Sequence, residues 1–310
     1  MLSDEKILVT GPGGNIGLPL VAYLARDNEV WGVARFTDPS SREAVRAAGA
    51  TTLAVDVASG ELGDLPDDFT YVVHLAVMQG PGLDYDAAMR VNAEGTGLLL
   101  QHCRAAKAAL VMSTHSVYMP HEDPEHCFAE TDPLGDANAL HSPTYSVSKI
   151  GQEAVARYCA RAFDLPVVIA RMNASYSAHA GLPTLHLQSV VAGKPVMTRW
   201  DPCTYSPIHQ DDINEQTAAI LDAASVPATI VNWAGDEAVS VQQWCAYVGE
   251  LIGRPAEVVV HEVPGTLRGS IADVTKRRAL TGPCKVGWRE GFRRILDERF
   301  ADRLVSSGGE

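Results

Sequence analysis

The feature that most restricts how this chain can fold is a glycine-rich turn near its start, where Gly11, Gly14 and Gly17 recur at every third position. Residues 6–10 before the turn form an apolar run typical of a strand, and the stretch through about residue 26 is typical of an amphipathic helix. In such a unit, we expect Gly11 to make the tight turn, Gly14 to let a pyrophosphate approach and Gly17 to let helix and strand pack closely. The N–H groups at the helix start would face the phosphates of a dinucleotide. A glycine turn with a structural role alone is the other interpretation.

Short apolar runs and longer amphipathic stretches alternate through the first two thirds of the chain. Such alternation is typical of buried parallel strands joined by crossover helices. The pattern therefore predicts an α/β fold, a doubly wound parallel sheet of the Rossmann type. The expected strands are 6–10, 29–35, 52–57, 71–76, 109–113 and 166–171, and the expected helices are 41–48, 85–106 and 144–163.

The regular alternation fades after about residue 175, where Gly and Pro punctuate a loop-rich region. We expect a dinucleotide-binding Rossmann domain over residues 1–175. Residues 176–305 are expected to form mainly a smaller C-terminal substrate-binding lobe that covers the carboxyl edge of the sheet. The segment around 204–235 is expected to return to the first domain, and helices are expected at 211–224 and 241–252. The last residues, 306–310, are expected to be a flexible tail.

The composition argues against several classes of partner. A formal net charge of −13 disfavours sequence-independent nucleic-acid binding, which needs Lys and Arg to neutralise phosphates. No apolar run approaches the roughly 20 residues of a membrane span, and no basic stretch followed by an apolar signal region opens the chain. The six cysteines form no Cys-x-x-Cys pair and the ten histidines no metal-ligand pattern. These features predict a cytoplasmic protein with no metal and a small-molecule substrate.

The end of the second expected strand bears on the choice between NAD and NADP. An acidic residue there would bind the adenosine ribose hydroxyls and repel a 2′-phosphate. Here the strand ends in Ala34 and Arg35, and the first acid is Asp38. A guanidinium with hydroxyls nearby suits a 2′-phosphate, so NADP(H) is favoured over NAD, with a solvated arginine as the alternative. Asp56, after the third strand, is expected either to bind the adenine amino group or to be a plain turn residue.

A second motif, Tyr145-x-x-x-Lys149, places a phenol and an ammonium on one face of an expected helix. A neighbouring ammonium favours the phenolate, so we expect Lys149 to lower the pKa of the Tyr145 hydroxyl. Tyr145 would then exchange a proton with a substrate hydroxyl, and Lys149 would also hold the nicotinamide ribose. The expected strand 109–113 leads into Thr114, whose hydroxyl is a candidate for bonding the reacting oxygen.

Over nearly its whole length the chain resembles the extended short-chain dehydrogenase/reductase superfamily, also called the NAD-dependent epimerase/dehydratase family. The resemblance implies that Thr114, Tyr145 and Lys149 are the catalytic set, with Asn92 as a weaker catalytic candidate or a helix-packing amide. It also implies a homodimer through the helices that contain Asn92 and Tyr145. The implied cofactor contacts are Gly11, Gly14, Asn15, Ile16, Gly17, Arg35, Asp56, Val57, Leu75, Ala76 and Lys149. Further matching residues are His74, Ser113, Val117, Tyr118, Arg171, Tyr176 and 208–212.

The sequence departs from this family at positions that bear on the substrate. Sugar dehydratases of the family carry Asp and Glu directly after the catalytic Thr, where this chain has His115 and Ser116, so a 4,6-dehydratase is not expected. His115 is either a group that titrates near neutral pH or a pocket or packing residue. Ala174, Tyr205 and Val263 stand where nucleotide-sugar enzymes have groups that hold the diphosphate. The expected substrate contacts are Thr114, His115, Tyr176 and Tyr205.

We therefore expect an NADP(H)-favouring oxidoreductase that interconverts a secondary alcohol and a ketone or aldehyde on a small or medium, partly apolar substrate. One alternative is a sugar epimerase that uses tightly held NAD, and a non-nucleotide sugar would be compatible with the residues at 174, 205 and 263. A cofactor-sensing protein without turnover is the other alternative, although the presence of Thr114, Tyr145 and Lys149 argues against it.

Overall fold

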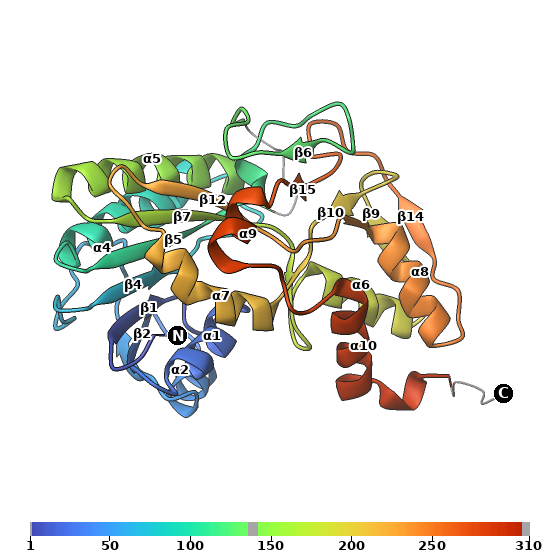
Figure 1. Cartoon of the computed structure of the whole chain (residues 1–310), viewed down its shortest axis with the longest axis horizontal. Helices are drawn as coiled ribbons and strands as arrows, with labels where there is room; N and C mark the ends of the chain where they lie inside the picture. Colours follow the sequence, from blue (N-terminus) through green and yellow to red (C-terminus); the bar gives the residue numbers. More distant parts are fainter. Residues whose placement is uncertain (1, 136–141, 306–310) are drawn as a thin grey trace.

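The computed structural model describes residues 2–135 and 142–305, so the predicted tail at 306–310 lies outside the described residues. Among them, a sheet of seven strands forms the centre of one half of the molecule (Figure 1). Each neighbouring pair of strands is parallel. In spatial order the strands are β12 (Thr229–Trp233), β7 (Val167–Met172), β5 (Ala108–Thr114), β4 (Tyr71–His74), β1 (Lys6–Thr10), β2 (Glu29–Ala34) and β3 (Thr51–Ala54). The order reverses between β1 and β4, which confirms the predicted doubly wound α/β fold.

Two layers of helices cover the sheet, and alternate residues of its strands face opposite layers. Ile7 and Val9 of β1 pack in one core with α1 (Gly17–Leu24), α2 (Pro39–Ala47) and α7 (Gln210–Asp222). Leu8 packs in a second core with α4 (Gly95–His102) and α5 (Tyr145–Phe163). Figure 1 shows these layers on opposite sides of the sheet. Both faces of the sheet are covered, which accounts for the long apolar runs of its central strands.

The single helix predicted for 85–106 is interrupted. The structure has α3 (Tyr85–Met89), a π-helical turn η1 (Arg90–Glu94) and then α4. The Thr96 hydroxyl of α4 donates to the carbonyl oxygen of Asn92 in this turn at 2.7 Å. Single π-helical turns are rare and occur often at functional sites. This turn carries Asn92, whose side chain bonds the segment after β4 and α5.

The second half of the molecule is a C-terminal lobe with its own apolar core, built on α6 (Leu182–Val191), α8 (Val241–Leu251) and α10 (Trp288–Arg299). The loop-rich pattern of this region in the sequence predicts neither α6 nor α9 (Thr275–Thr281) nor α10. The apolar spacing of Trp288, Phe292 and Ile295 would have indicated α10. The two-stranded pairs are β6 (Cys127–Phe128) with β15 (Ile271–Ala272), β8 (Ser175–Tyr176) with β11 (Ile208–His209), β9 (Val196–Thr198) with β14 (Val258–Val260), and β10 (Thr204–Tyr205) with β13 (Val239–Ser240); short 3-10 turns are η2 (His115–Val117) and η3 (Ala301–Arg303).

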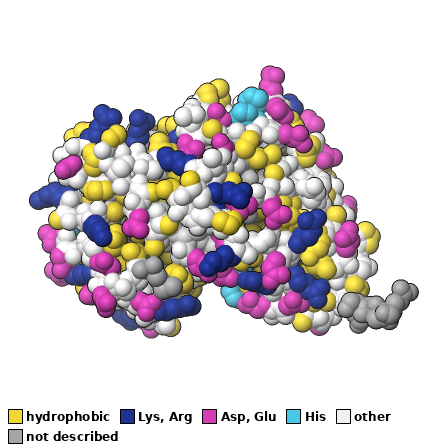
Figure 2. All heavy atoms as spheres, in the orientation of Figure 1, with side chains coloured by type: hydrophobic (Ala, Val, Ile, Leu, Met, Phe, Trp, Pro, Cys, Tyr) yellow, Lys and Arg dark blue, Asp and Glu magenta, His cyan; other side chains and the backbone are white. Residues whose placement is uncertain are grey.

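Acidic and basic side chains are interspersed over the face shown in Figure 2. Of the helices in the described residues, none combines the length and the apolar character needed to cross a bilayer.

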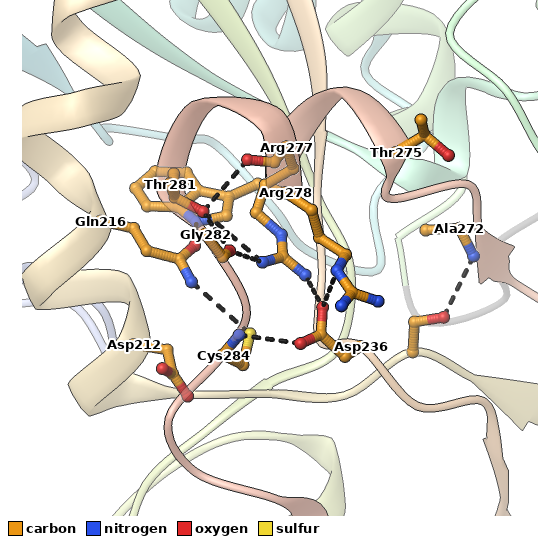
Figure 3. A network of polar contacts seen from close by, with 12 residues as sticks. Asp212, Gln216, Asp236, Ala272, Thr275, Arg277, Arg278, Thr281, Gly282 and Cys284 are labelled. Carbon is orange, nitrogen blue, oxygen red and sulfur yellow. Dashed lines mark hydrogen bonds and ion pairs between the residues drawn. The ribbon is translucent and has the colours of Figure 1, made fainter.

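A buried polar network fastens the chain between α9 and α10 to the end of β12 and to α7 (Figure 3). The Arg277 guanidinium, which is fully buried, pairs with Asp236 and donates to the Gly282 carbonyl at 2.8 Å. Asp236 also accepts from the Cys284 backbone N–H at 2.8 Å. Asp212 of α7 accepts from the next two backbone N–H groups, at 2.6 and 3.2 Å. These carboxylates position the start of α10, and through it the lobe.

Replacing Arg277 with methionine should lower the free energy of unfolding by about 3–5 kcal/mol, because Asp236 would keep a largely buried charge without its partner. Urea denaturation measures the change. Arg278→Met is the matched control: its side chain is 53% exposed and lies 3.9 Å from the same carboxylate, so a loss below about 1 kcal/mol is expected. Equal losses in the two variants would contradict this account of the network.

Candidate active site

The glycine turn lies at the point where the strand order reverses, and its backbone has no room for side chains. Gly11 has a φ of +65°, and a Cβ placed on it would lie 2.9 Å from the Ala76 backbone nitrogen. A Cβ on Gly17, the first residue of α1, would lie 2.3 Å from the Gly11 carbonyl oxygen. Glycine at both positions therefore brings β1, the start of α1 and the segment after β4 into direct contact.

Two adjoining cavities of about 280 Å³ each run past this turn and share Gly11, Gly14, Leu75 and Val77. The β2-side cavity is lined in addition by Gly13, Ala34, Arg35, Phe36, Thr37, Asp38, Ser41 and Ala76. The α5-side cavity is lined in addition by Asn15, Ile16, Gly17, Gln79, Met112, Ser113, Thr114, Tyr145, Lys149, Met172, Asn173 and Ser175. A long ligand with phosphates in its middle would occupy both cavities and cross the turn where the start of α1 favours anions. The residues present therefore fit a dinucleotide.

Thr114, Tyr145 and Lys149 come together in the α5-side cavity. Thr114 ends β5, whereas Tyr145 and Lys149 lie one turn apart at the start of α5. Burial raises the pKa of the Tyr145 hydroxyl, and its hydrogen bond with Thr114 partly offsets the rise. The expectation of a lowered Tyr145 pKa is therefore wrong, because desolvation of the phenolate is the largest effect on this hydroxyl and it raises the pKa.

The Lys149 amine is itself buried and its bonds point into the protein. It donates to the Met112 carbonyl oxygen and to the Gln152 side-chain oxygen, both at 2.6 Å. Burial lowers the pKa of the Lys149 amine to about 7, against the opposing effect of the Glu153 charge. With two of three N–H groups used, one remains for the cavity.

A buried ion pair holds α5 against the sheet directly behind these residues. Glu153 of α5 accepts two hydrogen bonds from the Arg171 guanidinium of β7, at 2.9 and 2.8 Å. The Ser113 hydroxyl of β5 adds a third bond to the same carboxylate, at 2.5 Å. These bonds set the position of α5 relative to β5, and hence of Tyr145 relative to Thr114.

Asn92 is fully buried and does not line either cavity. Its amide group exchanges two hydrogen bonds with the Met78 backbone, at 2.7 and 3.0 Å, and donates to the Ser148 hydroxyl at 2.9 Å. The structure therefore places it as a link between α5 and the segment after β4, whose residues Val77 and Gln79 line the α5-side cavity.

The β2-side cavity carries a cation without a partner. Arg35 is exposed and makes no hydrogen bond or ion pair within residues 2–135 and 142–305. The Asp38 carboxylate accepts from the Ser40 backbone N–H at 2.9 Å and from its hydroxyl, bonds that cap α2 and lower the pKa of Asp38. Asp56 is exposed and bonds the Ala58 N–H, whereas Val57 is buried in the core; neither lines a cavity described above.

The other predicted substrate contacts lie away from the α5-side cavity. His115 is buried, with its Nδ1 3.4 Å from the Ser270 hydroxyl, and burial lowers its pKa to about 3. It is therefore neutral, and the suggestion that it titrates near neutral pH is wrong. Tyr176 is buried in the lobe core, where its ring meets His209 and Phe292. Tyr205 accepts a hydrogen bond from Arg199 at 3.3 Å, and burial raises its pKa to about 12.

Several lining residues were missed by sequence analysis. Val77, Gln79, Asn173 and Ser175 lie in the segments that leave the carboxyl ends of β4 and β7, so their position after parallel strands is the available signal. The Asn173 amide accepts from the Ala174 and Ser206 backbone N–H groups at 2.8 and 3.1 Å and donates to the Ser270 carbonyl at 2.6 Å. It therefore connects the sheet to two lobe segments. No group of three or more His, Cys, Asp or Glu in the described part of the chain is placed to hold a metal ion.

Residues 7–202, more than half of the sequence, match the model of the NAD dependent epimerase/dehydratase family. The chain belongs to this family. It is an NAD(P)-dependent enzyme of the extended short-chain dehydrogenase/reductase type.

Individual relatives are distant. A segment of 177 residues is 28% identical to L-arabinose 1-dehydrogenase (NAD(P)(+)) of Haloferax volcanii; it covers 54% of this chain and 66% of that enzyme, less than two thirds of its length. Among solved structures, UDP-glucuronic acid 4-epimerase from Bacillus cereus, in complex with UDP-glucuronic acid and NAD, superposes with a TM-score of 0.81 at 23% identity, over 94% of this chain and 98% of that one. UDP-glucose 4-epimerase of Thermus thermophilus, in complex with NAD, gives 0.79 at 25% identity over the same shares.

Gly11→Ala should weaken the binding of both NADH and NADPH at least about tenfold, because the new methyl group meets the Ala76 backbone and the positive φ is strained. Fluorescence titration of the reduced nicotinamides measures the affinities. Gly63→Ala is the matched control, since its φ is +60° and no atom lies within 4 Å of the added Cβ. Unchanged affinity in Gly11→Ala would show that the turn does not contact the cofactor.

Proposed function

We propose that this enzyme is a dehydrogenase or reductase that interconverts a secondary alcohol and a carbonyl on a small substrate without a nucleotide diphosphate. The observation that carries the proposal is the convergence of Thr114, Tyr145 and Lys149 on one cavity that adjoins the glycine turn. This places a phenol, a hydroxyl and an amine beside the space that fits one end of a dinucleotide.

The proposed chemistry assigns one task to each side chain. A bound nicotinamide supplies the hydride donor or acceptor. The Tyr145 phenol exchanges a proton with the substrate oxygen, and the Thr114 hydroxyl donates a hydrogen bond to that oxygen. Lys149, once protonated, attracts the phenolate and offers its remaining N–H to the cofactor ribose. The Gly14 N–H donates to the Gly11 carbonyl oxygen at 3.1 Å, so the backbone N–H groups that follow it, up to the start of α1, bind the phosphates.

The substrate class is inferred from the residues that line the α5-side cavity and from the lack of diphosphate-binding side chains at positions 174, 205 and 263. Met112 and Met172 give it apolar walls, and Gln79 and Ser175 add polar groups. Ala174, Tyr205 and Val263 provide neither a guanidinium nor a side-chain amide for a diphosphate. The relative named as an L-arabinose dehydrogenase supports a small substrate with hydroxyl groups.

A sugar epimerase with tightly held NAD is the second candidate, because the epimerases named above share the fold over 94% of this chain. Denaturing the purified protein and identifying the released nucleotide separates the two. Near-stoichiometric NAD would favour the epimerase, whereas an empty site or NADP would favour a dehydrogenase that exchanges its cofactor. The homodimer predicted through the helices of Asn92 and Tyr145, and the cytoplasmic location, stay predictions.

Tyr145→Phe should lower the turnover of ketones or alcohols by about 10²–10⁴-fold while NADPH and NADH affinities stay within about twofold, because only the proton carrier is removed. A stopped-flow or steady-state assay against a panel of small sugars, alcohols and ketones measures turnover. Tyr158→Phe on the same helix, whose side chain is 67% exposed, is the control and should be unaffected. Turnover retained in Tyr145→Phe would contradict the role of Tyr145 as the proton carrier, whereas a native protein that binds the cofactor and turns over no substrate of the panel would fit the cofactor-sensing class.

We further propose that Arg35 makes the enzyme favour NADP(H), since it borders the β2-side cavity with no partner of its own. Arg35→Ser should weaken NADPH binding about tenfold and leave NADH binding unchanged, because a charge-assisted bond to the 2′-phosphate is lost. Arg46→Ser, at an exposed arginine of α2 that pairs with Glu43, is the control. Equal affinity of the native enzyme for NADH and NADPH would contradict the assignment.

A further inference from the structure

A buried chain of hydrogen bonds leads from the Lys149 amine to the backbone that borders the glycine turn. Its first link is Gln152, which is fully buried one turn after Lys149 and accepts from the amine at 2.6 Å. The Gln152 amide nitrogen then donates to the Thr96 hydroxyl oxygen at 2.9 Å. His74 Nε2 also lies 2.8 Å from this oxygen, and its Nδ1 lies 2.7 Å from the Thr10 hydroxyl. The chain ends at the Ala76 backbone N–H, 3.1 Å from Thr10.

The direction of each bond in this chain follows from counting protons. Thr96 has one hydroxyl proton, which it donates to the Asn92 carbonyl oxygen at 2.7 Å. Its oxygen must therefore accept from both Gln152 and His74, so His74 carries its proton on Nε2 and accepts from Thr10 on Nδ1. Burial lowers the pKa of His74 to about 3, which is consistent with a single ring proton.

The same count fixes the orientation of the Gln152 amide. Because the Thr96 oxygen has no proton left to give, Gln152 must present its NH₂ group to Thr96. Its carbonyl oxygen is then turned toward the Lys149 amine. A flipped amide would set an N–H against an ammonium and an oxygen against an oxygen without a free proton, leaving two buried contacts unsatisfied.

We propose that Gln152 is a positioning residue for Lys149: its carbonyl, locked by Thr96, His74 and Thr10, holds the amine in place and favours its protonated form. This inference rests on the proposed function, in which a protonated Lys149 attracts the Tyr145 phenolate. The second acceptor, the Met112 carbonyl of β5, leaves one N–H for the cavity. Gln152 thus decides how Lys149 is presented without itself lining the α5-side cavity.

The other groups around Lys149 leave this role to Gln152. On α5 itself, the Glu153 charge acts on the amine but is bound by Arg171 of β7, and Tyr145 is uncharged at neutral pH because its pKa is raised. His74 of β4 is neutral, and β5 contributes the Met112 carbonyl. The Asn92 amide of η1 is uncharged and bonds Ser148, the residue before Lys149.

The test compares Gln152→Met, which removes the acceptor at similar volume, with Gln152→Glu, which replaces it by a carboxylate. The full-length protein, with its lysines labelled with ¹³C at the ε carbon, is titrated by NMR, and the Lys149 signal is identified by its absence in Lys149→Arg. The midpoint of Lys149 should fall by about one pH unit in Gln152→Met and rise by about one unit in Gln152→Glu. NADH affinity, measured by fluorescence across the same pH range, should decline at a midpoint that moves in the same direction.

Midpoints that stay unchanged in both folded variants, or that move in the same direction, would overturn the inference and make Gln152 a core amide. If Gln152→Met does not fold, Thr96→Val tests the same contact from its other end, with Thr96→Ser as the control that keeps the hydroxyl. A Lys149 midpoint that falls in Thr96→Val but not in Thr96→Ser supports the inference. Equal midpoints in Thr96→Val and Thr96→Ser overturn it. The titration needs no substrate, so a native protein inactive on every alcohol and ketone overturns the proposed function while the midpoints still decide the role of Gln152.

Discussion

The bidentate ion pair between Glu153 and Arg171 is the interaction on which the geometry of the site depends. Both side chains are almost completely buried, at 4% and 2% exposed, so each charge requires the other. Glu153 belongs to α5 and Arg171 to β7, and Ser113 of β5 bonds the same carboxylate. Because few placements of three separate elements satisfy all of these bonds, the pair specifies where α5 lies. Thr114 and the start of α5 then face one another as a consequence.

The parts of this arrangement that follow from local rules could be predicted from the sequence. Strand β1 begins and ends where its apolar run does, and α5 begins and ends within one residue of its expected bounds. The glycine turn is recognisable because the positive φ of Gly11 and the close backbone contacts at Gly11 and Gly17 leave little choice of residue. The meeting of Thr114 with Tyr145 could be expected for a similar reason, since the carboxyl ends of parallel strands share one edge of the sheet.

The parts that depend on how distant segments pack could not be predicted in this way. Asn92 is a candidate catalytic group in the sequence, and only the folded chain shows its amide bonded to Met78 and Ser148. Tyr176 and Tyr205 were expected at the substrate, but the lobe core takes up their rings. Nothing in their local sequence distinguishes an aromatic residue that faces a ligand from one that faces α8 and α10. Gln152 was overlooked because a buried amide acquires a role only through its partners.

The Tyr–Lys motif alone does not determine the charge of either side chain. A charged lysine would stabilise a nearby phenolate, but burial also acts on the lysine itself. In this fold burial disfavours both charged forms, raising the pKa of Tyr145 and lowering that of Lys149 to about 7. The ammonium therefore has to be stabilised before it can stabilise a phenolate. The dipole of a carbonyl stabilises the ammonium, but less than the full charge of a carboxylate would. A carboxylate in the place of the Gln152 amide would raise the pKa of the Lys149 amine and make the amine a strong base. An amide at position 152 and the Met112 carbonyl thus leave the amine close to its midpoint at neutral pH, where small changes in the cavity decide its charge.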